Sequence, residues 1–280
     1  MGKVRLDVLL TERNLAPSRE RAKAYIMEGL VFVNGLREDK PGSVFDPAEA
    51  KIEVKADPLP YVSRGGLKLE KAVTLWGLSF AEMTCLDIGA STGGFTDVML
   101  QGGAKKVYAV DSGSNQLAYS LRTDARVVCM EKTNFRYVTK ANIAEPVDFA
   151  AADVSFISLE KILPPAYALL KPFARMVCLI KPQFEAGREL VGKHGVVKDK
   201  KVQENVILRI IAAAVSYGFT AEALSFSPVT GPKGNIEFLL LLRKTDSAQS
   251  LIPETEAGCI VGEAHETFAD TSRRQGQETA

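Results

Sequence analysis

Four charged residues lie where a folded chain could bring them to one site. Asp153 ends the apolar run VDFAAAD, and Lys181 ends the apolar run RMVCLIK. Lys68 follows the glycine-rich SRGGL, and Glu237 lies in GPKGNIEF. The carboxyl ends of parallel strands meet at the ligand crevice of an open α/β sheet, so we expect Asp153 and Lys181 to be neighbours. Each residue alone is more often a surface charge or a salt bridge, but the four together favour proton transfer and charge stabilisation.

A glycine-rich loop lies between two apolar runs in residues 85–111, CLDIGASTGGFTDVMLQGGAKKVYAVD. Glycines allow sharp turns and close approach to a ligand, and the helix-like segment that follows offers unpaired amides. The loop has neither the GxGxxG spacing of nicotinamide binding nor the GKS or GKT of an ATP-binding P-loop. With an acid at the end of the second run, where it can accept hydrogen bonds from ribose hydroxyls, the segment favours S-adenosylmethionine. The predicted cofactor contacts are Gly89, Ser91, Gly93, Gly94, Phe95, Asp111 and, near the adenine, Asn134.

The cysteines and histidines indicate no metal chemistry. The four cysteines form no CxxC pair, and three of them lie in apolar strand-like runs, where cysteine usually acts as a small buried hydrophobe. The two histidines, His194 and His265, are too few and too far apart for a metal site or a histidine-centred triad. We therefore predict no metal site.

The elements that would position the site occupy residues 67–244. Helix-like and strand-like segments alternate there, which predicts an α/β fold with a doubly wound, mainly parallel sheet. The stretch ends in two adjacent strand-like segments, TAEALSFSPV and IEFLLLLRK. That ending fits a class I, Rossmann-like methyltransferase, whose seven-stranded sheet has an antiparallel last strand, better than an ordinary dinucleotide-binding fold.

Residues 1–59 are predicted to form a smaller unit, joined to the first by a linker at 60–66. Two short helices precede a small hairpin, and arginines lie on the second helix. The segment SRERAKAYIMEGLVFVNG resembles the α-L RNA-binding module of a small-subunit ribosomal protein, tyrosyl-tRNA synthetases and pseudouridine synthases. A helical cap with solvated charges is the alternative. The predicted RNA contacts are Arg5, Arg19, Arg21, Lys23, Ser63 and Arg64.

The net charge of +1 conceals an uneven distribution. Residues 61–244 hold 23 basic and 17 acidic side chains, whereas residues 245–280 hold 2 and 7. A polyanionic partner and a solvated surface explain this asymmetry about equally well. The acidic tail from 245 to 280 lacks sustained apolar periodicity, so we predict that it is disordered.

The apolar segments predict a protein without a membrane partner. Stretches such as ILRIIAAAVSYGF fall short of the roughly 20 apolar residues that a membrane-spanning helix needs. The amino-terminal sequence is charged and amphipathic and has no secretory signal pattern. These features predict a cytoplasmic location.

The chain from about Lys3 to Lys244 resembles the TlyA family, whose members are labelled hemolysins but act as ribosomal RNA ribose methyltransferases with an FtsJ-like catalytic domain. The motifs that carry the resemblance are SRERAKAYIMEGLVFVNG, YVSRGGLKL, LDIGASTGGFTD, EKTNFR, DVSFISL, IKPQFE and GPKGNIEF. The resemblance implies a ribosomal RNA substrate, modified at a ribose 2'-hydroxyl of cytidine. The lysine–aspartate–lysine–glutamate tetrad of ribose 2'-O-methyltransferases is matched by Lys68, Asp153, Lys181 and Glu237. The position of the modified nucleotide, the ribosomal subunit that contains it and the oligomeric state of the protein stay open.

Methyl transfer to a hydroxyl needs a positioned oxygen and a base that removes its proton. We assign the base to Lys181 and the orientation of the ammonium groups to Asp153 and Glu237. Lys68 would either steer the hydroxyl or stabilise the developing alkoxide. A neighbouring ammonium and partial burial favour a neutral amine, whereas carboxylates favour the ammonium form. The sequence does not decide between these influences.

Two other functions are compatible with parts of the sequence. A membrane-lytic hemolysin would need an amphipathic or apolar membrane element, and the apolar segments are better explained as buried strands and their covering helices. A non-catalytic RNA-binding protein would have little reason to keep all four chemical groups of the tetrad. Both are therefore less favoured than the methyltransferase.

Overall fold

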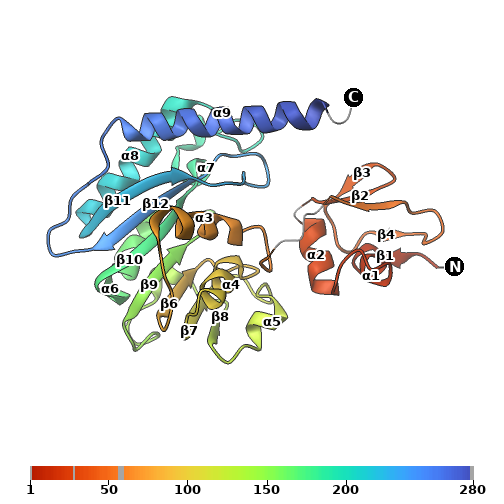
Figure 1. Ribbon diagram of the computed structural model, residues 1–280, viewed down its shortest axis with the longest axis horizontal. Helices are drawn as coiled ribbons and strands as arrows, with labels where there is room; N and C mark the ends of the chain where they lie inside the picture. Colours follow the sequence, from red (N-terminus) through yellow and green to blue (C-terminus); the bar gives the residue numbers. More distant parts are fainter. Residues whose placement is uncertain (1, 28, 56–59, 278–280) are drawn as a thin grey trace.

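The computed structural model describes residues 2–27, 29–55 and 60–277. They form a small N-terminal unit and a larger unit built on one sheet, connected through the segment that follows residue 55 (Figure 1). Of the predicted linker at 60–66, all residues are described, whereas the end of the predicted first domain, residues 56–59, lies outside the described residues.

The N-terminal unit packs two helices against short antiparallel strands. Strand β2 lies between β3 and β5, and β1 pairs with β4. The buried residues Leu6, Leu10, Ala22, Ile26 and Val31 form its core at helical and strand spacing. The elements are β1 (Val4–Arg5), α1 (Leu6–Glu12), α2 (Arg19–Met27), β2 (Val31–Val33), β3 (Leu36–Glu38), β4 (Val44–Phe45) and β5 (Ile52–Val54).

The larger unit is a seven-stranded sheet in the order β11-β12-β10-β9-β6-β7-β8. Strand β12 runs antiparallel to both of its neighbours, and the pairs among β10, β9, β6, β7 and β8 are parallel, so the predicted class I arrangement is confirmed. The strands are β6 (Thr84–Ile88), β7 (Lys106–Val110), β8 (Val127–Met130), β9 (Val147–Ala152), β10 (Leu170–Ile180), β11 (Phe219–Phe226) and β12 (Phe238–Lys244).

Helices cover both faces of this sheet, which explains why central strands such as β6 are buried along their whole length. Buried residues of α3 and α4 form an apolar cluster on one face, and those of α6 and α8 form a second cluster on the other. The helices are α3 (Gly66–Trp76), α4 (Gly94–Gln101), α5 (Tyr119–Arg122), α6 (Leu163–Leu169), α7 (Pro182–Glu185) and α8 (Lys200–Ser216), with single 3-10 turns at Phe135–Tyr137, Leu159–Lys161 and Arg188–Leu190.

The prediction that residues 245–280 are disordered is wrong for most of that segment. Ser250 bridges to Ala221 of β11, and α9 (Glu256–Gln277) follows. Helix α9 packs against α8 and the edge strand β11 through a buried stripe, and it forms the upper border of the view in Figure 1. The stripe consists of Ala257, Ile260, Val261 and Ala264, which have helical spacing. The acidic residues Glu263, Glu266 and Asp270 of the same helix are exposed.

No helix in the described part of the chain is both long and apolar enough to cross a membrane.

Candidate active site

The four residues of the predicted tetrad meet at one edge of the sheet. Lys68 lies in the first turn of α3, Asp153 follows β9 and Lys181 follows β10. Glu237 precedes β12, and because β12 is antiparallel, its start lies at the same edge as the ends of β9 and β10. The side chains form a chain of alternating charge: Lys68 Nζ lies 2.8 Å from Glu237 Oε2 and 3.1 Å from Asp153 Oδ2, and Lys181 Nζ lies 2.5 Å from Asp153 Oδ1.

These charges are largely removed from water. Lys68 is 9% exposed, Lys181 8% and Glu237 2%. Burial would lower the pKa of Lys68, but Asp153 and Glu237 outweigh it and raise that pKa. Burial would likewise raise the pKa of Asp153, but Lys68 and Lys181 lower it to about 2. At neutral pH, Lys68 is therefore an ammonium group and Asp153 a carboxylate.

The two lysines have different surroundings. Lys68 faces two carboxylates, whereas in the described part of the chain Lys181 forms an ion pair with Asp153 alone and donates a hydrogen bond to Ser155 Oγ at 3.1 Å. The second carboxylate, Glu237, further stabilises the charged form of Lys68, and Lys181 has no such second ion pair among the described residues. The two amines therefore differ in the number of carboxylates that they contact.

Three residues beside the tetrad were not predicted from the sequence. Ser155 is the hydroxyl partner of Lys181, and Gln183 Nε2 donates to Glu237 Oε1 at 3.3 Å. Phe156 is 89% exposed, has a positive φ of 61° and lies against the ring of Phe184. An exposed aromatic ring is suited to stacking on a nucleobase. These residues lie two or three positions after Asp153 or Lys181 in DVSFISL and IKPQFE, so proximity to the tetrad in the sequence was the available signal.

A cavity of about 620 Å³ opens beside the tetrad. It is lined by Gly89, Ser91, Asp111 and Asn134 of the predicted cofactor contacts, and also by Asp153 of the tetrad. Gly89 has a φ of 86°, and a Cβ there would lie 2.5 Å from the carbonyl oxygen of Asp153. Only glycine permits this close approach, which brings the loop after β6 against the end of β9.

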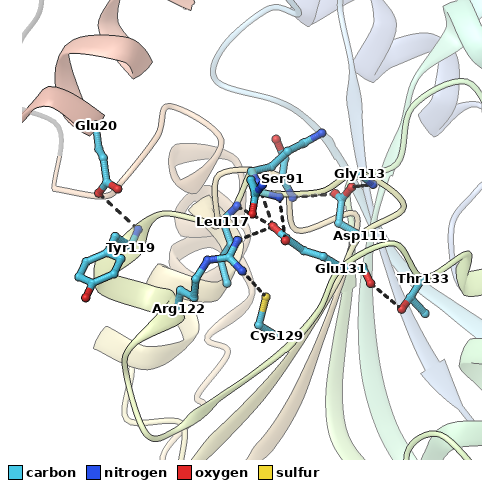
Figure 2. Close-up of polar contacts among 12 residues, drawn as sticks. Glu20, Ser91, Asp111, Gly113, Leu117, Tyr119, Arg122, Cys129, Glu131 and Thr133 are labelled. Atoms are coloured by element: carbon cyan, nitrogen blue, oxygen red, sulfur yellow. Dashed lines mark hydrogen bonds and ion pairs between the residues drawn. The ribbon is translucent and has the colours of Figure 1, made fainter.

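Asp111 lines this cavity, and Figure 2 shows its polar contacts. Its carboxylate accepts hydrogen bonds from the Ser91 amide at 2.8 Å and the Gly113 amide at 2.6 Å. Glu131 directly follows β8. Its carboxylate accepts a hydrogen bond from the Leu117 amide and forms an ion pair with Arg122 at 2.6 Å. The two carboxylates thus fix the backbone that borders the cavity.

The pKa of Glu131 supports this role. The hydrogen bond from Arg122 lowers the pKa, burial opposes it, and backbone amides add to the lowering, so that the pKa is about 2. Glu131 is therefore charged at neutral pH and holds the loop that contains Leu117.

Three predicted cofactor contacts do not line the cavity. Phe95 is 3% exposed and belongs to the apolar core between the sheet and α4, so its side chain does not face a ligand. A Cβ on Gly93 would lie 2.3 Å from the side chain of Leu121, and one on Gly94 would lie 2.6 Å from Ser63 Oγ. These glycines allow neighbouring elements to pack against the loop, which is a different requirement from ligand contact.

Three of the predicted RNA contacts, Arg5, Arg19 and Arg21, have partners within the protein. Arg5 and Arg19 form ion pairs with the buried Asp7 at 2.9 and 3.0 Å, and their side chains remain 46% and 53% exposed. Arg21 donates to the Tyr61 carbonyl oxygen. The arginine pairs therefore also hold the N-terminal unit together, and contact with RNA stays a prediction.

A second cavity, of about 740 Å³, lies between α2 and the larger unit. Lys23 lines it, and the Tyr119 amide donates to Glu20 Oε2 at 3.3 Å at its border (Figure 2). In the linker, Ser63 and Arg64 accept backbone hydrogen bonds from Gly66 and Leu67 and thereby lead into α3. RNA contact by Lys23, Ser63 and Arg64 likewise stays a prediction.

Comparison with known proteins places both units in families. Residues 61–244 match the FtsJ-like methyltransferase family, and residues 4–49 match the S4 domain family. YqxC of Bacillus subtilis, provisionally named an rRNA methyltransferase, is 53% identical over 271 residues, which cover 96% of each chain. The 16S/23S rRNA (cytidine-2'-O)-methyltransferase TlyA of Mycobacterium tuberculosis is 42% identical over 249 residues, covering 89% of this chain and 93% of that protein.

A solved structure from Streptococcus thermophilus, titled provisionally as a hemolysin, has a TM-score of 0.78 and 49% sequence identity. The match covers 98% of this chain and 99% of that chain. The chain therefore belongs to the TlyA family, in which an S4 domain precedes an FtsJ-like methyltransferase domain.

Proposed function

We propose that this protein transfers a methyl group from S-adenosylmethionine to the ribose 2'-hydroxyl of a cytidine in ribosomal RNA, with Lys181 as the base. The observation that carries the proposal is the buried chain of alternating charge that runs from Glu237 through Lys68 and Asp153 to Lys181 and borders the cavity at Asp153. The named activity of the Mycobacterium tuberculosis relative supports the choice of ribosomal RNA and of cytidine. Ribosomal RNA as substrate supports action in the cytoplasm.

The cavity fits S-adenosylmethionine in size and in the chemistry of its walls. Its volume of about 620 Å³ is in the range of sites that bury a small ligand. Asp111 offers carboxylate oxygens for ribose hydroxyls, and the loop at Gly89 and Ser91 offers close backbone contact. The bound cofactor would supply a methyl group on a positively charged sulfur, which is open to attack by an oxygen nucleophile.

The side chains of the tetrad would provide the remaining chemistry. After losing its own proton, Lys181 takes the proton from the ribose hydroxyl as the oxygen attacks, and Ser155 holds the amine in place. Lys68, kept charged by two carboxylates, stabilises the negative charge that develops on the oxygen. Asp153 lies between the two amines and sets their separation.

The S4 unit would hold structured RNA at a distance from the reacting nucleotide. Its half-exposed arginines suit phosphate contacts, and two linked binding sites raise affinity by increasing the effective concentration at the second site. Phe156, exposed at the cavity, is suited to stack on the base of the target nucleotide.

The test is a methyl-transfer assay with labelled S-adenosylmethionine and purified ribosomal subunits. Wild-type protein should place label on ribose, and Lys181→Ala should not, while cofactor binding is retained. Lys171→Ala is the matched control, because Lys171 lies at the opposite end of β10 and pairs with Asp148 on the surface. Label on a base, or near-normal transfer by Lys181→Ala, would contradict the proposal.

Two outcomes of related assays would favour the other functions. Tight RNA binding by wild-type protein without any transfer of label would support a non-catalytic RNA-binding protein. Leakage of lipid vesicles caused by the purified protein would support a membrane-lytic activity.

A further inference from the structure

Helix α9 packs on α8 and β11, which in turn contact the elements that hold the Lys68–Glu237 ion pair. The helix lies outside residues 61–244, the stretch that matches the FtsJ-like family. Its buried face packs on α8 and along β11, as the upper part of Figure 1 shows. Two series of side-chain contacts start from this face. The first route, as we call such a series, runs through α8 to the turn before β12, and the second runs through β11 to α3. The two routes end at opposite members of the same ion pair.

The first route is a series of hydrogen bonds. His265 Nε2 lies 2.9 Å from Gln203 Oε1, and Gln203 Nε2 donates to the Val197 carbonyl oxygen at 2.8 Å. The Val197 amide donates to Asn235 Oδ1 at 3.0 Å. Gln203 is 1% exposed and Asn235 3%, so loss of either partner would leave a buried polar group unsatisfied. Because breaking these hydrogen bonds is costly, they fix the relative positions of α9, α8, the loop that contains Val197 and the turn that contains Asn235.

The series ends on the turn that contacts Glu237. Asn235 Nδ2 donates to the Gly195 carbonyl oxygen at 2.8 Å, and the Gly231 amide donates to the Asn235 carbonyl oxygen at 2.9 Å. A Cβ on Gly231 would lie 2.8 Å from Glu237 Oε1, so the turn is in close contact with that carboxylate. The Ser227 amide donates to the Glu237 carbonyl oxygen at 2.8 Å. A shift of the turn would therefore move Glu237.

The second route consists of ring and cation contacts. The rings of Phe268 in α9 and Phe226 in β11 are 6.2 Å apart. Lys71 Nζ lies 3.6 Å from the centre of the Phe226 ring, and Lys71 is one helical turn after Lys68 in α3. Burial lowers the pKa of Lys71, and the carboxylate of Glu263 in α9 opposes that lowering. Through Phe226 and Lys71, helix α9 is thus also connected to α3, the helix that carries Lys68.

We propose that α9 is a positioning element of the catalytic site, acting on Glu237 through Gln203 and Asn235 and on Lys68 through Phe226 and Lys71. This inference rests on the proposed methyl transfer. None of the connecting residues lines the cofactor cavity. The effect of α9 therefore falls on the rate of transfer and leaves the affinity for S-adenosylmethionine unchanged.

The first test variant is Gln203→Met, which removes both hydrogen bonds of the side chain at similar volume. We expect the transfer rate at saturating cofactor and RNA to fall about tenfold, as small misplacement of a catalytic group can cause. The dissociation constant for S-adenosylmethionine should be unchanged, and amide hydrogen exchange at Ser227 and Gly231 should become faster. Ile211→Ala is the matched control, because it removes a buried contact of α8 outside the series and should lower Tm with a normal transfer rate.

The second pair of variants, His265→Leu and His265→Gln, acts on α9 itself at a partly exposed position and decides the question if Gln203→Met does not fold. We expect His265→Leu to reduce the rate and speed exchange at Ser227 and Gly231, and His265→Gln, which keeps a donor, to restore both. Unchanged exchange and an unchanged rate in His265→Leu would overturn the inference. If wild-type protein transfers no label, the proposed function fails, and the exchange measurement still decides whether α9 holds the turn.

Discussion

Asp7 and Asp153 each lie between two cations, and the two clusters differ in the type of cation and in its exposure. The arginine cluster of the S4 unit consists of Arg5, Asp7 and Arg19, and the lysine cluster of the active site consists of Lys68, Asp153 and Lys181. Both carboxylates are mostly buried. The arginine side chains are 46% and 53% exposed, whereas the lysine side chains are 11% and 10% exposed.

This difference indicates what each cluster can do. A guanidinium keeps its proton under all physiological conditions, so a half-exposed arginine that is held by a carboxylate is suited to binding an anion. A lysine can exchange its proton when burial and neighbouring charges act on it, so a buried lysine pair is suited to acid–base chemistry. We therefore expect the arginine cluster to contact RNA and the lysine cluster to take part in methyl transfer.

The largest effect should come from making the lysine cluster resemble the arginine cluster. Lys181→Arg keeps the positive charge beside Asp153 but removes the group that can accept a proton. We expect the single-turnover rate of methyl transfer to fall about 10²–10⁴-fold, the usual contribution of a general base. The affinity for S-adenosylmethionine should stay within about twofold of wild type. A rate close to that of wild type would show that Lys181 acts only through its charge.

Removal of the central carboxylate should affect stability more in the lysine cluster than in the arginine cluster. Asp153→Asn leaves two buried cations without their shared partner and should cost about 3–5 kcal/mol in the free energy of unfolding. Asp7→Asn leaves half-exposed arginines that water can solvate, so we expect a cost of about 1–3 kcal/mol. Denaturant unfolding of both variants measures the difference. A larger loss in Asp7→Asn would contradict the comparison.

Acid should reduce the stabilising effect of Asp153. Burial would raise its pKa, but Lys68 and Lys181 lower it to about 2, below the ordinary value of 3.8. A carboxyl group with a lowered folded pKa stabilises the protein above the ordinary pKa, and this contribution is lost as pH falls toward the folded value. The difference in unfolding free energy between wild type and Asp153→Asn should therefore be constant near pH 7 and shrink below about pH 4. A difference that is independent of pH would contradict the assigned charge state.

The smallest effect should come from the exposed arginines. Arg19→Gln removes one positive charge from α2, and we expect RNA affinity to fall a few-fold and the salt dependence of binding to decrease by about one counterion. The transfer rate at saturating RNA should be unchanged. Measurement of binding at several salt concentrations, with Lys171→Ala as a control for loss of charge, separates these effects. Unchanged affinity and salt dependence would remove Arg19 from the RNA-contacting surface.

The sheet and the meeting of Asp153 with Lys181 could be predicted because both depend on alternation along the chain. Apolar runs of strand length separated by helical segments determine a parallel sheet, and the end of each strand then has a known place. The presence of Glu237 and Lys68 in the same site was implied by the family resemblance, and the structure explains it, because β12 runs opposite to β10 and starts at the same edge. These features need no knowledge of packing between distant side chains.

The remaining features depend on packing that a linear pattern does not reveal. The pairing of Arg19 with Asp7 requires α2 to be placed against α1, whereas Arg5 lies only two residues before Asp7. Phe95 follows a ligand-binding loop in sequence, but α4 turns its ring into the core. Helix α9 was missed because the four small apolar residues of its buried stripe lie in an acid-rich segment, where composition outweighs a short periodic signal.

The central claim, that the lysine cluster works by releasing a proton from Lys181, is tested most directly by the pH dependence of the single-turnover rate of methyl transfer. The account predicts a wild-type rate that rises about tenfold per pH unit and then reaches a plateau, because one proton must leave the base before it can act. It also predicts a low rate for Lys181→Ala that lacks this rise. A flat wild-type profile, or the same rise in Lys181→Ala, would contradict the assignment of Lys181 as the base.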